Sequence, residues 1–108
     1  MIINIAKDYS KTPGGRFISE GKYSGEDFRK KVLEPAFQES QKKQEKLTVN
    51  LDGGYGYGSS FLEEAFGGLA RQTRSDRVLC DIIIISDEEP RLIDDIREYM
   101  EDALNAKR

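Results

Sequence analysis

Short apolar runs alternate with longer amphipathic stretches along the chain. Three runs are rich in β-branched residues and bounded by turn residues, which predicts strands: "IINIA" at the start, "LTVNL" over 47–51 and "VLCDIIII" over 78–85. The last run is continuously apolar, so we expect a central strand covered on both faces. A fourth segment, "RFISEG" over 16–21, follows the turn "SKTPGG" and predicts a strand that pairs with the first as a hairpin.

Helical periodicity fills the intervals between the later strands. The first predicted helix begins at Ser24, and its buried stripe includes Phe28 and Val32. Pro35 interrupts this stripe and predicts a kink or a helix in two parts. Two further helices are expected after the glycine-rich loop and after the last strand. Each helix start carries a serine followed three residues later by an acidic residue, as in a capping box: Ser24 with Asp27, Ser60 with Glu63, and Ser86 with Glu89.

The predicted order is strand, strand, helix, strand, helix, strand, helix. This order indicates an α/β fold, with a four-stranded mixed sheet and about three helices packed on it. A chain of 108 residues can close one core, and neither an internal repeat nor a linker divides it. We therefore expect residues 1–108 to form a single domain.

Composition and charge exclude several classes of function. The formal net charge of −3, without a long basic block, disfavours nucleic acid as a partner. The absence of histidine removes Ser-His and Cys-His nucleophiles and most zinc sites, so we expect no metal or cofactor. No apolar stretch approaches the roughly 20 residues of a membrane span. A single cysteine, Cys80, and the lack of a signal peptide favour a reduced, cytoplasmic location without a membrane partner.

The segment "DGGYGYGSSFLEE" places a glycine-rich loop between a strand and a helix, a geometry that can present backbone N–H groups to phosphate. The known nucleotide motifs are not matched. Gly58 occupies the lysine position of a P-loop, and Ser59 takes the place of the third glycine of the dinucleotide-binding motif. What remains is a flexible loop with two hydroxyls at a helix start. Either serine can act as N-cap, and if Ser60 caps the helix, the Ser59 hydroxyl is free.

Neighbouring residues extend this candidate surface. Tyr55 and Tyr57 lie between glycines and are either contact residues or packed on the domain. The pair in "FGGL" either ends the helix early or lets another backbone or a partner approach closely. We expect the partner-binding or ligand-binding surface to be drawn from the following residues: Gly14, Gly15, Arg16, Gly54, Tyr55, Gly56, Tyr57, Gly58, Ser59, Ser60, Phe61, Gly67 and Gly68.

Charged residues near the loop have competing interpretations. Arg16 follows two glycines and either binds an anion or carboxylate, or is a solvated residue of a hairpin turn. Glu63 and Glu64 adjoin the loop, but adjacent helical residues point about 100° apart and make a poor acid/base pair. We expect these two carboxylates to support the helix start, and we expect no catalysis.

The segments "PGGRFISEGKYSGEDFRKKVLEPAF" and "LDGGYGYGSSFLEEAFGGLAR", together spanning about 13–71, resemble the STAS-like domain family of unknown function. The resemblance implies the fold of anti-sigma factor antagonists, a four-stranded mixed sheet with helices. In those proteins the strand-to-helix junction reads D-S-S-G, and a partner ATP-dependent kinase phosphorylates its first serine. The residues that fall on this motif are Gly58, Ser59, Ser60 and Phe61, so both of its flanking positions differ here.

The resemblance implies Ser59, with Ser60 beside it, as the phosphoacceptor candidate. The leading hypothesis is a non-enzymatic regulatory module that binds a protein partner, a histidine-kinase-like ATPase, and is switched by phosphorylation at the loop–helix junction. The alternative is a sensor that holds a nucleotide or another phosphate-bearing small molecule with the glycine loop, the helix N-terminus and Arg16.

Overall fold

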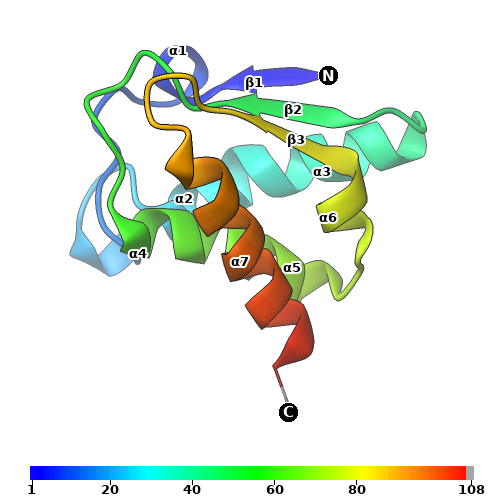
Figure 1. Ribbon diagram of the computed structural model, residues 1–108. Helices are drawn as coiled ribbons and strands as arrows, with labels where there is room; N and C mark the ends of the chain where they lie inside the picture. Colours follow the sequence, from blue (N-terminus) through cyan, green and yellow to red (C-terminus); the bar gives the residue numbers. More distant parts are fainter. Residues whose placement is uncertain (107–108) are drawn as a thin grey trace.

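Three parallel strands form the sheet of the computed structural model, which describes residues 1–106 (Figure 1). The strands are β1 (Ile2–Asn4), β2 (Leu47–Asn50) and β3 (Ile82–Ile85), and their spatial order is β1-β2-β3. In the register of the sheet, Thr48 lies opposite Ile2 on one side and Ile83 on the other. The chain is α/β as expected, but the prediction of a four-stranded mixed sheet is wrong.

The missing strand is the segment 16–21. Its residues form a bend and a single 3-10 turn, η1 (Ile18–Glu20), because the Glu20 carboxylate accepts the backbone N–H groups of Arg16 at 2.8 Å and Phe17 at 2.9 Å. Such local side-chain acceptors compete with a strand ladder for the same donors. Without a hairpin partner, β1 pairs with β2 alone.

The run "VLCDIIII" divides into two elements. Its first half belongs to the short helix α6 (Arg77–Asp81), which is supported by an ion pair of 2.7 Å between Arg77 and Asp81, one turn apart. Only its second half forms β3, and β3 is an edge strand. The prediction of a buried central strand here is therefore wrong. That position belongs to β2, whose Leu47 and Val49 side chains are fully buried.

The helix that starts after Ser24 has three parts: α2 (Gly25–Phe28), the π-helical turn η2 (Arg29–Leu33) and α3 (Glu34–Lys42). The Ser24 side chain accepts the N–H of Asp27 at 3.0 Å, so the predicted N-cap is confirmed. The interruption expected at Pro35 takes the form of the π-turn directly before it, in which the Glu34 N–H donates to the Arg29 carbonyl. A widened turn relieves the crowding that a proline ring causes in a regular helix.

The next helical segment also contains a π-turn, and it comprises α4 (Ser59–Leu62), η3 (Glu63–Gly67) and α5 (Gly68–Thr73). The early end considered at "FGGL" does not occur, since the segment stops at Arg74, whose φ is 53°. The remaining helices are α1 (Ile5–Asp8) and α7 (Arg91–Asn105), so residues 1–106 contain five helices, with α2–α3 and α4–α5 each counted as one.

Two predicted capping boxes are wrong. The helix start of α4 has Gly58 as its N-cap and no side-chain cap, so Ser60 and Glu63 do not form a capping box. Helix α7 begins five residues after Ser86, at Arg91, and the Ser86 hydroxyl instead donates to the Glu89 carbonyl at 2.7 Å, ahead of the helix.

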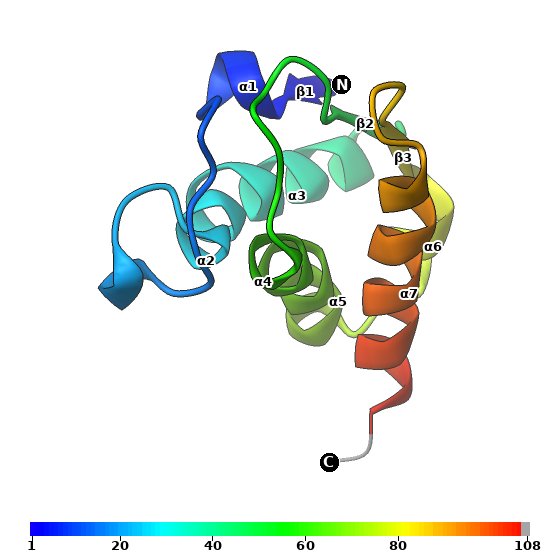
Figure 2. The same cartoon turned by 60° about the vertical axis from the view of Figure 1, so that its left-hand side comes forward.

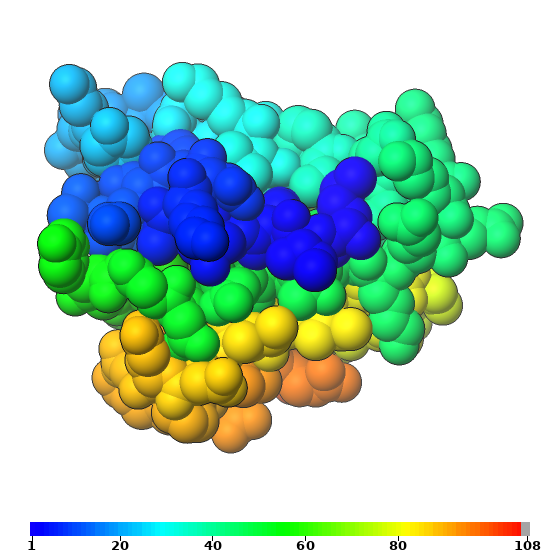
Figure 3. All heavy atoms as spheres, turned by 90° about the horizontal axis from the view of Figure 1, so that it is seen from above, coloured from blue at the N-terminus to red at the C-terminus, as the bar shows by residue number. Residues whose placement is uncertain are grey.

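The long helices all lie on one face of the sheet (Figures 1 and 2). The spatial order of the parallel strands is the same as their order in the sequence. Two right-handed crossovers in such a sheet place both helical connections on the same face. The core between sheet and helices contains these fully buried side chains: Phe28, Leu33, Val49, Phe61, Phe66, Leu69 and Ile96. The opposite face of the sheet is open to solvent, where Ile2 is 73% exposed and Ile83 is also exposed (Figure 3).

Candidate partner-binding edge

The glycine loop leaves the carboxyl end of β2 and runs along the N-terminal segment before it enters α4 (Figure 1). The Tyr55 N–H donates to the Lys11 carbonyl at 2.9 Å, and a side chain at Gly54 would approach that same carbonyl to 3.2 Å. Gly53 and Gly56 have φ values of 97° and 125°, which favour glycine. The glycines therefore let the loop pack closely against the segment around Lys11, and this contact orders the loop.

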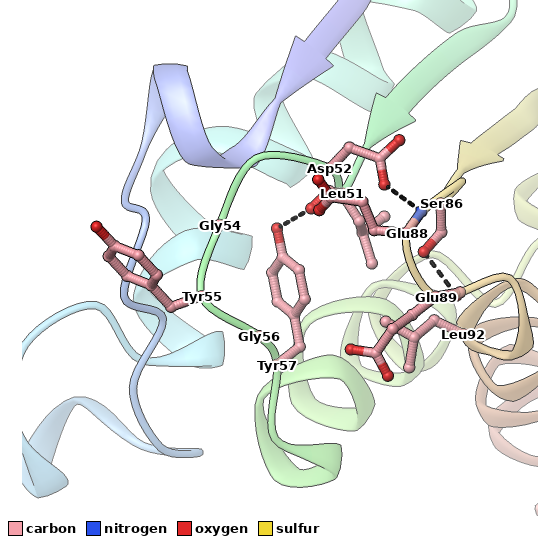
Figure 4. Close-up of a pocket in the computed structure, with 10 residues that line it drawn as sticks. All are labelled: Leu51, Asp52, Gly54, Tyr55, Gly56, Tyr57, Ser86, Glu88, Glu89 and Leu92. Carbon is pink, nitrogen blue, oxygen red and sulfur yellow. Dashed lines mark hydrogen bonds between the residues drawn. The ribbon is translucent and has the colours of Figure 1, made fainter.

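A second set of hydrogen bonds ties the loop to the turn between β3 and α7 (Figure 4). The Asp52 carboxylate accepts the N–H groups of Asp87 at 3.1 Å and Glu88 at 3.0 Å. In return, the Glu88 carboxylate accepts the Gly53 N–H at 3.0 Å. We call these reciprocal bonds the Asp52–Glu88 clamp. It holds together the two loops that follow the carboxyl ends of adjacent parallel strands.

The two tyrosines of the loop have different environments. Tyr57 is half-buried, and its hydroxyl donates to the Leu51 carbonyl at 2.8 Å. Burial, together with the negative charges of Asp52 and Glu88, raises the pKa of Tyr57 to about 12. Tyr55 is 84% exposed and points away from the rest of the loop (Figure 4). Packing thus accounts for Tyr57, whereas Tyr55 is free to contact a partner.

Ser59 and Ser60 lie side by side at the start of α4, and both are exposed. Within residues 1–106 their hydroxyls form no hydrogen bond, and no side chain caps this helix start. Phe61, the next residue, is fully buried against Phe28 and Tyr57. The structure therefore presents two accessible hydroxyls directly beside a rigid, buried anchor.

A small hollow lies between the loop and the start of α7 (Figure 4). Its volume is about 120 Å³, and three carboxylates, those of Asp52, Glu88 and Glu89, belong to its lining. Ligand pockets usually measure roughly 300–1,000 Å³. The size and the negative charge of this hollow both disfavour a nucleotide or another phosphate-bearing ligand.

Arg16 does not reach the glycine loop's hollow. Its guanidinium donates to Glu63 and lies 3.7 Å from Glu64, and Arg71 forms a further ion pair with Glu63 at 2.6 Å. Burial opposes the ionisation of Glu63, but hydrogen bonds from Arg71 and Arg16 outweigh it and lower the pKa of this carboxyl. Arg16 therefore binds carboxylates of the same chain.

The glycines near Arg16 shape the turn that positions it. A side chain at Gly14 would lie 2.5 Å from the Lys22 carbonyl, so the two sides of this turn approach closely at that point. The Gly15 carbonyl accepts the Gly25 N–H at 2.9 Å, which joins the turn to the start of α2. The atoms nearest to a side chain at Gly14 or Gly15 belong to Glu20, Lys22 and Tyr23, and none belongs to the glycine loop.

Gly67 and Gly68 are buried inside the second helical segment. A Cβ at Gly68 would lie 2.6 Å from the Nε of Arg29, and a Cβ at Gly67 would lie 2.6 Å from the Glu63 carboxylate. The close approach inferred from "FGGL" is therefore made by side chains of this chain. The structure does not bring Gly67 and Gly68 to the surface that Tyr55 and Ser59 share.

Arg29 is the residue that the sequence did not single out. It is buried, donates to the Glu64 carbonyl at 3.2 Å, and forms ion pairs with Glu34 at 2.5 Å and Glu64 at 3.0 Å. Two sequence features could have indicated these ion pairs. Arg29 directly follows the buried Phe28, and Gly67 and Gly68 leave room on a helix for a long side chain. Together with the Arg16 pairs, these contacts occupy both Glu63 and Glu64 in structural roles.

Potential metal ligands, apolar helices and the single cysteine are the other features of residues 1–106 that bear on function. They contain no group of three or more potential metal-ligating side chains. Among the helices of residues 1–106, none combines the length and apolar character needed to span a membrane. Cys80 is exposed and unpaired. The exposed loop and its two serines therefore remain the most distinctive surface feature, and we refer to residues 53–60 as the glycine-loop edge.

The comparisons with known proteins agree with this description at the level of the family. A family model described as a STAS-like domain of unknown function matches residues 24–92, which is more than half of the chain. No curated protein and no solved structure matches the chain significantly. The matched region includes the π-interrupted helices, the glycine-loop edge and β3. The chain belongs to the STAS-like domain family of unknown function.

Proposed function

We propose that the chain is a non-enzymatic regulatory module that binds a protein partner through the glycine-loop edge. The observation that carries this proposal is Tyr55, which is 84% exposed on a loop whose backbone is fixed on both sides. Exposed tyrosines are frequent energetic anchors of protein interfaces. Because the loop is already ordered, a partner would pay little conformational entropy to bind it.

Phosphorylation at Ser59 or Ser60 is the switch that we propose for this edge. Both hydroxyls are accessible, and the first-turn N–H groups of α4 lack a side-chain cap. A phosphate would add about −1.5 to −2 charges at pH 7 beside the loop. The helix dipole would tolerate this charge within the free protein, whereas a partner packed on Tyr55 would have to desolvate it. The partner class suggested by the family resemblance is a histidine-kinase-like ATPase.

A phosphate-binding sensor is not proposed, because the features that suggested it are separated. The hollow at the loop is small and lined by carboxylates, and Arg16 is engaged by Glu63. Catalysis is not proposed either, since Glu63 and Glu64 are both held in ion pairs with arginines. A binding role needs none of these groups to be free.

The proposal is tested by capture from an extract of the native cell with three immobilised baits: the unmodified chain, Ser59→Asp and Ile2→Ser. Ile2 is an exposed residue of the open sheet face and serves as the matched control. We expect an ATPase to be retained by the unmodified chain and by Ile2→Ser, and lost with Ser59→Asp. Equal capture by all three baits would remove Ser59 as the switch, and loss with Ile2→Ser alone would move the interface to the sheet face.

A further inference from the structure

A second surface lies on the lobe formed by residues 13–24, which projects beside α2 (Figure 2). A groove of about 460 Å³ separates this lobe from the helix, and its lining consists of Ile18, Gly21, Lys22, Tyr23, Asp27 and Lys31. None of these residues lines the hollow at the glycine loop. We call this surface the lobe groove.

Large apolar side chains are concentrated on the lobe. Ile18 is 50% exposed, Tyr23 is 42% exposed, and the adjacent Phe17 is 45% exposed. Single exposed apolar residues are common on protein surfaces, but several gathered beside a groove are typical of an interaction site. The groove is also in the size range of sites that hold a side chain or a small ligand.

Hydrogen bonds within the lobe and to the start of α2 hold the lobe in place. The Gly14 N–H donates to the Tyr23 carbonyl at 2.8 Å, and the Glu26 N–H donates to the Arg16 carbonyl at 3.0 Å. At its tip, the Ile18 N–H donates to the Glu26 carboxylate at 2.9 Å. The apolar side chains are therefore presented in a fixed arrangement, which lowers the entropic cost of binding.

Tyr23 supports a functional interpretation because its backbone is strained. Its φ is 61°, a left-handed conformation that glycine or asparagine would adopt at lower cost. The ring is kept in place by an edge-to-face contact with Tyr9, 5.6 Å between centroids, and the Tyr9 hydroxyl donates to Asp27 at 2.6 Å. Tyr23 thus packs on Tyr9 and still remains 42% exposed, so part of its surface is available to a partner.

The charged side chains at the groove favour an acidic partner. The lining of the groove contains two lysines, Lys22 and Lys31, and one carboxylate, Asp27, so its local net charge is positive although the chain's is −3. At the groove itself, Lys31 pairs with Asp27 at 3.0 Å, while Lys22 has no carboxylate partner within residues 1–106. An acidic segment would therefore find a complementary lysine beside an apolar floor.

We propose that the lobe groove docks an acidic segment of a partner protein. In this arrangement an aromatic or aliphatic side chain of the partner packs on Ile18 and Tyr23, and a carboxylate lies beside Lys22. This surface is separate from the glycine-loop edge, so either proposal can fail while the other stands.

The test uses ¹⁵N-labelled full chain and two synthetic peptides, acetyl-EEFEE-amide and acetyl-KKFKK-amide. We expect the acidic peptide to cause saturable shifts in the amide resonances of residues 17–31, and the basic peptide to cause none there. The Tyr23→Gly variant suits the left-handed backbone, so it should remain folded and weaken acidic-peptide binding at least five-fold. Lys22→Glu should weaken it similarly, whereas Ile2→Ser should bind like the unmodified chain.

Three results would overturn the proposal. The first is equal shifts with both peptides, which would show that charge does not select the ligand. The second is an unchanged acidic-peptide affinity in a folded Tyr23→Gly variant. The third is that acetylphenylalanine, a small carboxylate with the same ring, binds as tightly as the acidic peptide, since the groove would then be a small-molecule pocket.

Discussion

The absence of a side chain at Gly68 makes room for the buried side chain of Arg29. The guanidinium passes across the helix at the point where Gly68 has no side chain, and from there it reaches Glu64 and Glu34. A buried charge is tolerated only when it is paired and hydrogen-bonded, so the glycine is required for the ion pairs.

Replacing Gly68 with alanine should therefore destabilise the protein. The new Cβ would lie 2.6 Å from the Arg29 Nε and displace it from both carboxylates. The loss should be ~2–4 kcal/mol of unfolding free energy, because breaking a buried pair costs ~3–5 kcal/mol and alanine regains up to ~1 kcal/mol of helix propensity. Urea denaturation measures it, with Gly58→Ala, whose Cβ would meet nothing within 4 Å, as control. Equal stabilities for both variants would contradict this account.

Glu63 gives stability a defined dependence on pH. Its pKa is lowered in the folded state, so the contribution is complete above the ordinary glutamate pKa of about 4.3 and is lost as the pH falls through the lower folded value. Glu63→Gln should cost about 1 kcal/mol at pH 7 and less near pH 3. Thermal unfolding at several pH values tests the sign, and a variant that loses more stability at pH 3 than at pH 7 would contradict it.

At the scale of elements, the glycine loop is ordered by its neighbours on both sides. Lys11 holds it from the N-terminal segment, and the Asp52–Glu88 clamp holds it from the turn after β3. The loop's exposed residues are thus supported by two loops that are distant in sequence.

Removing the clamp should loosen the loop without unfolding the sheet. Asp52→Ala deletes an acceptor of two backbone N–H groups, and hydrogen bonds to a charged group contribute ~1.5–3 kcal/mol each. We expect amide hydrogen exchange over residues 53–58 and 87–88 to accelerate at least ten-fold, while β2 stays protected. Asp87→Ala, whose carboxylate forms no bond within residues 1–106, is the control. Unchanged exchange in Asp52→Ala would show that the clamp does not order the loop.

Helical periodicity predicted the long helices, because their buried stripes are set by local spacing. Strands are harder to predict from local pattern than helices. The segment "VLCD" has the composition of a strand but is helical, because Arg77 and Asp81 form an ion pair across one helical turn. The segment 16–21 was misassigned because Glu20 captures its backbone donors. The loop and its serines could be recognised from residue type. The pairing of Arg16 and Arg29 with carboxylates could not, because it depends on tertiary contacts that bring the segment 13–24 and η2 against η3.

At the scale of the whole molecule, both proposed binding surfaces lie on connections between the strands and the helical layer. The core closes one face of the sheet, and the glycine-loop edge and the lobe groove are formed by connections that follow β1 and β2. The hollow at the glycine loop, of about 120 Å³, is too small for a nucleotide.

A nucleotide panel should therefore leave thermal stability unchanged. A ligand present at 100 times its dissociation constant would stabilise the folded chain by ~2.7 kcal/mol, which a melting curve detects readily. We expect no shift with purine nucleoside mono-, di- or triphosphates at millimolar concentration. A reproducible increase with any of them, abolished by Arg16→Ala, would revive the sensor hypothesis.

The central claim is that a partner contacts the glycine-loop edge, and site-specific photocrosslinking tests it most directly. A photoreactive phenylalanine analogue replaces Tyr55 in one variant. In the control it replaces Lys42, the exposed last residue of α3, a helix that ends on the side of the molecule away from the glycine loop (Figure 1). Irradiation in native extract should give one crosslinked protein from position 55, competed by unmodified chain and lost when Ser59→Asp is added, and none from position 42. Crosslinking from position 42 alone, or from neither position, would contradict the account.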